Sequence, residues 1–104
     1  MSDLSYWVYM LLCENNTYYT GYTNNLERRY LSHVMGTGRC KYTQSFKPIK
    51  IAQSWEIKEG KAKAMQIERY IKKLSWIEKD KLVNEPNLLE ACLLDRAPCR
   101  QESF

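Results

Sequence analysis

The sequence predicts an α+β domain, and three observations support this fold class. Two runs rich in aromatic and β-branched residues, 5–13 and 18–23, have the pattern of strands, and residues 49–57 add a third. Apolar residues recur at helical spacing over residues 26–34 and 60–74, which predicts two helices after the first strands. A chain of 104 residues is long enough to bury one core and too short for two domains.

The first strand, residues 5–13, is apolar on both faces and should therefore lie in the centre of the sheet. Residues 14–17 have the composition of a turn, so this strand and residues 18–23 should form an antiparallel hairpin. Tyr9 and Tyr19 can be near neighbours in that hairpin. Paired aromatic residues also stabilise many sheets without any other role, so both interpretations stay open.

The first helix should follow Asn24 or Asn25, since either side chain can cap a helix start. Leu26, Tyr30 and Val34 recur at steps of four residues, so we expect them to face the core.

Arg29 and His33 lie one turn apart beside this apolar stripe. With Tyr19 they bring a phenol, a permanent cation and a group that titrates near neutrality toward one place, a set that suits phosphate chemistry. The alternative is structural: an arginine at a helix edge, a histidine at the core boundary and a tyrosine in a sheet. Spacing alone favours the structural interpretation.

One further residue and one further segment are candidates for binding nucleic acid. Gly21 interrupts the second strand, and a residue without a side chain lets another group come close. Residues 36–43, G-T-G-R-C-K-Y-T, should form a loop in which Arg39, Lys41 and Tyr42 can hold a phosphate backbone. A glycine-rich basic segment is also an ordinary way to leave a helix.

Glu68 is the most informative residue of the second helix. It falls within the apolar arc formed by Ala64, Ile67 and Ile71, so its carboxylate should face the core. A buried carboxylate needs a cation, and either Arg29 or a divalent metal ion can supply it. A purely structural salt bridge is an equally good explanation.

The end of the chain has a different composition. Ser75 and Glu78 have the spacing of a capping box, which predicts a short helix over about residues 76–83. We expect residues 1–84 to form the folded domain, and residues 85–104 to form a short helix and an acidic tail.

The formal net charge is +4, and it is unevenly distributed. Residues 1–84 carry fourteen Lys and Arg against eight Asp and Glu, whereas residues 85–104 carry two against four. A basic domain favours a polyanionic partner such as nucleic acid over a small-molecule substrate, although such a charge also serves solubility. The longest apolar run, Trp7 to Cys13, is too short to span a membrane, and Met1–Asp3 starts no secretory signal, so we expect a cytoplasmic protein.

With these residues identified, the chain resembles the GIY-YIG nuclease superfamily, and within it the small single-domain bacterial branch that shares a G-x-G-x-x-K-Y-T segment. The resemblance covers about Tyr6 to Val83. The positions that match the family's motifs are Trp7-Val8-Tyr9, Tyr19-Thr20-Gly21, Arg29, His33 and Glu68. Tryptophan and threonine replace the first glycine and the second isoleucine of the family name, but both tyrosines and the second glycine are kept.

The resemblance implies a small three-stranded antiparallel sheet flanked by helices, and a metal-dependent endonuclease that hydrolyses phosphodiester bonds of nucleic acid, DNA more than RNA. Glu68 would hold one divalent cation, Mg²⁺ or Mn²⁺, and Arg29 would neutralise charge that develops on the phosphate. Tyr9 would orient or deprotonate the attacking water, with His33 sharing the proton, and Tyr19 would position the phosphate.

Two other functions remain open on the sequence. The first is a nucleic-acid-binding module of the same fold that does not cleave. The second is a protein-interaction adaptor that uses the acidic tail. Because no motif for sequence recognition is evident, a nuclease of this kind would have low specificity or rely on a targeting protein partner.

Overall fold

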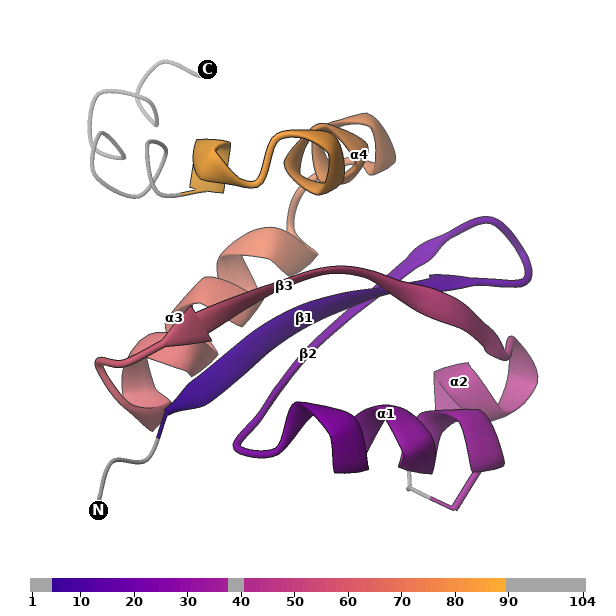
Figure 1. Cartoon of the computed structure of the whole chain (residues 1–104). Helices are drawn as coiled ribbons and strands as arrows, with labels where there is room; N and C mark the ends of the chain where they lie inside the picture. The colour runs from indigo at the N-terminus through magenta and orange to yellow at the C-terminus, as the bar shows by residue number, and fades with distance from the viewer. Residues whose placement is uncertain (1–4, 38–40, 90–104) are drawn as a thin grey trace.

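The computed structural model of the chain describes residues 5–37 and 41–89. Its centre is a three-stranded antiparallel sheet of β1 (Tyr6–Cys13), β2 (Tyr18–Thr23) and β3 (Pro48–Ile57), in the order β2-β1-β3 (Figure 1). The predicted fold class, the hairpin and the central position of the first strand are therefore confirmed.

Helices cover both faces of the sheet. The helices α1 (Leu26–Met35) and α2 (Lys41–Ser45) lie against one face, and α3 (Lys61–Lys72) and α4 (Trp76–Asn84) lie against the other (Figure 1). Among the described residues, no helix has both the length and the apolar character that a membrane crossing requires.

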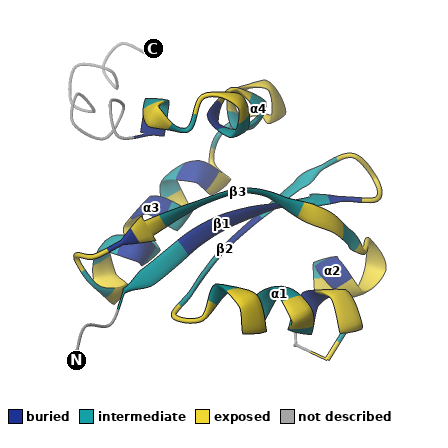
Figure 2. Cartoon of the chain, in the orientation of Figure 1, coloured by how far each residue is buried: buried dark blue, intermediate teal, exposed yellow. Residues whose placement is uncertain are grey.

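The alternation of side chains along β1 creates two cores, one on each face. Val8 and Met10 point toward α3, where they join Ile67 and Ile71 in the larger cluster. On the other face, a smaller cluster has its buried members in β1 and is covered by half-buried aromatic residues; the three buried members are Tyr9, Leu11 and Cys13. Both faces of β1 are buried, as Figure 2 shows, so the apolar composition of the first strand is explained.

Helix α1 begins and ends as its sequence predicts, but it presents a different face to the sheet. The Asn25 side chain accepts a hydrogen bond from the backbone N–H of Arg28, and Gly36 ends the helix in the left-handed conformation. The prediction that Val34 faces the core was wrong, because Val34 is 36% exposed whereas His33 is 2% exposed. Steps of four residues drift around a helix with about 3.6 residues per turn, so by the second step, at Val34, the preceding residue His33 faces the sheet instead.

The segment after α1 also differs from the prediction. Residues 36–43 were expected to form a loop, but Lys41, Tyr42 and Thr43 belong to the short helix α2. This helix packs next to α1 and buries Thr43 against His33. Arg39, the remaining basic candidate of the segment, lies outside the described residues.

The second half of the domain matches the prediction closely. Ala64, Ile67 and Ile71 are all buried along α3, and α4 begins with a complete capping box between Ser75 and Glu78. The expected acidic tail lies almost entirely outside the described residues.

Candidate active site

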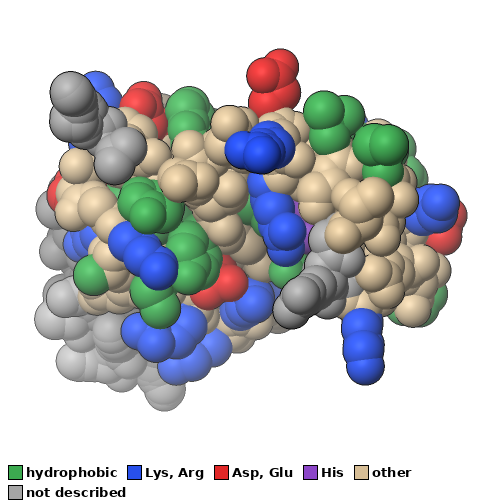
Figure 3. Space-filling view, turned by 90° about the horizontal axis from the view of Figure 1, so that it is seen from below, with side chains coloured by type: hydrophobic (Ala, Val, Ile, Leu, Met, Phe, Trp, Pro, Cys, Tyr) green, Lys and Arg blue, Asp and Glu red, His purple; other side chains and the backbone are tan. Residues whose placement is uncertain are grey.

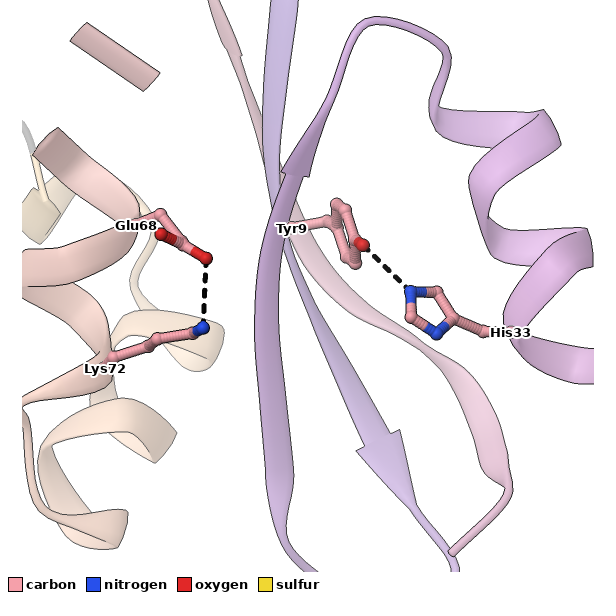
Figure 4. Close-up of polar contacts among 4 residues, drawn as sticks. All are labelled: Tyr9, His33, Glu68 and Lys72. Atoms are coloured by element: carbon pink, nitrogen blue, oxygen red, sulfur yellow. Dashed lines mark hydrogen bonds and ion pairs between the residues drawn. The ribbon is translucent and has the colours of Figure 1, made fainter. Parts of the chain in front are cut away.

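A buried chain of hydrogen bonds connects β1, α1 and α2. The Tyr9 hydroxyl lies 2.9 Å from His33 Nε2 (Figure 4), and His33 Nδ1 lies 2.8 Å from the Thr43 hydroxyl. All three side chains are 2% exposed or less. Because β1 is the central strand and both helices are packed on its face, the chain is held in a rigid part of the molecule.

His33 is uncharged at neutral pH. Its burial removes water from the imidazolium, and the nearby positive charge of Arg29 adds to this effect, so the pKa of His33 falls from its ordinary value to about 4. A neutral imidazole has one nitrogen that donates and one that accepts. The ring can therefore accept a hydrogen bond from one of its two hydroxyl neighbours and donate one to the other.

Gly21 makes room for Tyr9. The two residues face each other across the β1–β2 pair, and a Cβ atom added at Gly21 would lie 2.5 Å from the Tyr9 hydroxyl oxygen. The close approach predicted at Gly21 therefore exists, and the group that approaches is the Tyr9 phenol. A direct contact of Gly21 with nucleic acid stays a prediction.

Tyr19, on the edge strand β2, covers the hydrogen-bonded chain of Tyr9, His33 and Thr43. It pairs with Leu11 in the sheet, which places it on the same face as Tyr9 and two positions away in register. Its ring meets the His33 ring edge-on, with 5.2 Å between centroids, and stacks on Tyr42 at 5.9 Å. Tyr9 and Tyr19 are therefore near neighbours, as the hairpin predicts, and Tyr19 is the more exposed of the two phenols.

Arg29 lies one turn before His33 on α1 and is half-buried. It borders a shallow hollow at the start of the helix together with Asn25, Arg28 and Ser32. Seen from the side of α1, several Lys and Arg side chains are spread over the surface, and the single histidine shows only as a sliver beside one of them (Figure 3). Arg29, whose positive charge acts on His33, is therefore partly accessible from solvent.

Glu68 lies on the opposite side of the sheet. Its carboxylate pairs with Lys72, one turn later on α3, with 3.0 Å between Oε2 and Nζ (Figure 4). Of the two partners that the sequence offered for Glu68, Arg29 forms no ion pair with it among the described residues, because the sheet separates their helices. The structural salt bridge that stood as the alternative is present, and Lys72 provides it. The Glu68 side chain is 15% exposed, so it is mostly buried, as the helical arc predicted.

Lys72 connects the two sides of the sheet. Its ammonium lies 5.8 Å from the centroid of the Tyr19 ring, so it reaches around the outer edge of β2. A groove follows this edge, and its lining comes from β2, α2, α3 and α4: Thr17, Tyr18, Tyr19, Thr20, Tyr42, Lys72, Trp76 and Lys79. The two halves of the candidate site therefore meet at β2.

The donor groups fit only a loosely held metal ion. Within residues 5–37 and 41–89, no group of three or more His, Cys, Asp or Glu side chains is arranged to hold a metal. The Glu68 carboxylate is a hard oxygen donor, and its present partner is a cation. Mg²⁺ commonly binds through one or two carboxylates together with substrate phosphates and retained waters, so one such oxygen donor is compatible with it.

Sequence reasoning missed two contacts of this site. Lys72 was not among the candidates, although its position four residues after Glu68 is the spacing of a helical ion pair. Thr43 carries no such signal, since its contact with His33 depends on how α2 packs against α1. Two of the nucleic-acid contacts predicted in residues 36–43 can be placed: Lys41 is exposed, and Tyr42 stacks on Tyr19.

Comparison with known proteins agrees with the resemblance seen in the sequence. The family model described as the GIY-YIG catalytic domain matches residues 5–80. A UPF0213 protein of Clostridium perfringens is 40% identical over 84 residues, which are 81% of this chain and 88% of that protein. Another, of Natronomonas pharaonis, is 44% identical over 78 residues, or 75% of this chain and 89% of that protein.

A solved structure is also similar in sequence. The solution NMR structure of a UPF0213 protein from Bacillus halodurans is 34% identical, and the match covers 86% of this chain and 96% of that chain with a TM-score of 0.49. Since the family model spans most of the sheet and both of the long flanking helices, this chain belongs to the GIY-YIG family of catalytic domains.

Proposed function

We propose that this protein is a metal-dependent endonuclease that hydrolyses phosphodiester bonds in nucleic acid, DNA rather than RNA. The observation that carries the proposal is the buried chain of Tyr9, His33 and Thr43, covered by Tyr19 and flanked by Arg29. A neutral histidine between two hydroxyls, beside a permanent cation, is a set of groups that suits proton transfer next to a phosphate. A cytoplasmic location belongs to the same proposal, as does either low sequence specificity or a separate targeting partner, the two alternatives that the sequence leaves open.

Arg29 and Tyr19 are the groups that would contact the phosphate. Arg29 is partly exposed and always charged, so it can pair with a phosphate oxygen and stabilise the negative charge that grows as water attacks phosphorus. The Tyr19 hydroxyl can hold a second phosphate oxygen and fix the orientation of the scissile bond.

Tyr9 and His33 would handle the proton. The attacking water loses a proton as its oxygen bonds to phosphorus, while the bond to the leaving sugar oxygen breaks and that oxygen gains a proton. In the tautomer whose Nε2 carries no proton, uncharged His33 accepts a hydrogen bond from the Tyr9 hydroxyl, and the pair can then pass a proton away from the attacking water. Because Tyr9 is only 1% exposed, we assign it to proton transfer behind the surface and not to phosphate binding.

Glu68 is the residue that would hold the divalent cation, Mg²⁺ or Mn²⁺. Such a cation, when bound, polarises the phosphate and stabilises the leaving oxygen. The remaining contacts with the nucleic-acid backbone are assigned to Gly21, Arg39, Lys41 and Tyr42, as the sequence predicts.

The direct test is cleavage by the purified protein. End-labelled single-stranded and double-stranded DNA, and RNA of the same sequence, are incubated with Mg²⁺, Mn²⁺ or EDTA, and the products are separated by length. We expect internal cuts in DNA that need the metal. Cutting that continues in EDTA would refute the mechanism, and cutting of RNA alone would refute the substrate.

The Lys72–Glu68 ion pair favours a second candidate, a binding module that does not cleave. A carboxylate already neutralised by an ammonium group requires no metal ion. This candidate predicts DNA binding that weakens steeply with salt, survives Glu68→Ala, and produces no cleavage with any metal.

A further inference from the structure

Lys72 contacts two parts of the candidate site at once. Its ammonium is 3.0 Å from the Glu68 carboxylate and 5.8 Å from the centroid of the Tyr19 ring (Figure 4 shows the ion pair). The Lys72 side chain is 48% exposed, whereas the Glu68 side chain is 15% exposed. Lys72 therefore supplies the positive charge that a mostly buried carboxylate needs, while its ammonium remains within reach of a ligand on the surface.

The groove along β2 has the chemistry to bind a phosphate backbone. Lys72 and Lys79 provide two positive charges along it. Thr20 also lines the groove, but its hydroxyl is buried and does not reach the surface. Trp76 adds an aromatic surface that is 42% exposed and is held by stacking on Tyr18. Two cations and a fixed aromatic ring together favour a nucleic-acid strand over an uncharged ligand.

We infer that Lys72 couples nucleic-acid binding to cation binding at Glu68. In the free protein, the Lys72 ammonium is paired with the Glu68 carboxylate, so it competes with a divalent cation for that carboxylate. A backbone phosphate in the groove attracts the same ammonium, so Lys72 moves toward the phosphate and leaves the Glu68 carboxylate for the metal. No covalent bond changes in this exchange. The inference rests on the proposed function, because it presumes that Glu68 is the metal ligand.

Little free energy is needed to move the Lys72 ammonium from Glu68 to a phosphate. A partly exposed lysine–carboxylate pair within one helix is weak, and the lysine stem has four flexible carbon–carbon bonds. Coupling of two ligands is reciprocal, so a cation at Glu68 must also strengthen nucleic-acid binding by the same factor. Removing the ammonium should raise the affinity of Glu68 for a divalent cation about twofold, the typical size of a helical lysine–carboxylate pair four residues apart.

The test measures Mn²⁺ binding to the free protein, through the electron paramagnetic resonance signal of unbound Mn²⁺. Lys72→Met should bind Mn²⁺ about twofold more tightly than the original protein. Lys73→Met, the matched control on the same helix end, should bind as the original protein does. Adding Glu68→Gln to Lys72→Met should remove the gain. An unchanged affinity in Lys72→Met, with the fold intact by circular dichroism, would overturn the inference.

A second measurement tests the coupling itself. An end-labelled DNA oligonucleotide is titrated with protein by fluorescence anisotropy, with and without Ca²⁺ at constant ionic strength. Ca²⁺ should tighten binding to the original protein and have no such effect on Glu68→Gln. If the protein shows this coupling but does not cleave DNA, the proposed function alone is refuted. If the protein is a metal-dependent nuclease but Lys72→Met binds Mn²⁺ as the original protein does, the inference alone is refuted.

Discussion

The residues that the two sides of the sheet contribute to the candidate site differ in how firmly they are held. On the α1 side, the chain of Tyr9, His33 and Thr43 is buried and fixed by hydrogen bonds through both ring nitrogens. On the α3 side, Glu68 and Lys72 form an ion pair that is partly open to solvent. The difference teaches that the first group is preorganised by folding, while the second can exchange its partner when a charged ligand arrives.

The difference between the two sides of the sheet predicts that substitution of His33 causes the largest loss of stability. His33→Ala removes two buried hydrogen bonds and leaves a cavity beside β1, so the free energy of unfolding should fall by about 3 kcal/mol. Urea unfolding followed by circular dichroism measures this change. The neighbouring Val34→Ala, which truncates an exposed side chain, is the control and should cost less than about 0.5 kcal/mol. Equal effects of the two substitutions would contradict the assigned helix face.

The low pKa of His33 also makes stability depend on pH. The unfolded chain takes up a proton at histidine near pH 6.5, whereas folded His33 does so only near pH 4. The stabilisation is therefore complete above about pH 6.5 and is lost as the pH falls toward 4, by at most about 3 kcal/mol. Comparing urea unfolding of the original protein and His33→Gln at both pH values isolates this contribution. A variant with the same pH dependence as the original would show that His33 is not the group responsible.

Gly21 provides a sharper test of the packing around Tyr9. Gly21→Ala places a methyl group on the Tyr9 phenol, and overpacking of this kind should cost about 2 kcal/mol of stability. Tyr9→Phe removes the closest atom, so the double variant should lose less than the sum of the two single losses. Additive losses would mean that the methyl group is accommodated in another way.

The smallest effect on stability is expected on the other side of the sheet. Lys72→Met removes a partly exposed ion pair and keeps the aliphatic stem, so the free energy of unfolding should change by less than about 1 kcal/mol. Thermal unfolding is the measurement. A loss as large as that of His33→Ala would show that both regions are structural and would remove the distinction between them.

The sequence alone was sufficient for the strands, the hairpin and the approximate extent of the two long helices, because strand-forming composition, turn residues and the helical spacing of apolar residues are local signals. It was also sufficient to single out Tyr9, Tyr19, Arg29, His33 and Glu68, through their spacing and the family resemblance. It was not sufficient for the face that α1 presents, since Val34 and His33 differ by only one position on the helix.

Contacts between distant segments account for the remaining differences. The bond between His33 and Thr43 depends on α2, a helix of five residues that has too few apolar positions for a periodic pattern. Arg29 on α1 was one of the two partners that the sequence offered for Glu68, the other being a divalent metal ion. The helices of Arg29 and Glu68 pack against opposite faces of the sheet, an arrangement that no local pattern encodes.

The central claim is that residues from both sides of the sheet serve one metal-dependent cleavage site at β2. Its most direct test is the single-turnover rate of DNA cleavage in Mg²⁺ for Arg29→Ala from one side and Glu68→Gln from the other. Each should lose at least about 100-fold, whereas the matched controls Arg28→Ala and Glu59→Gln should cleave at nearly the original rate. Cleavage by Glu68→Gln at the original rate would contradict the claim.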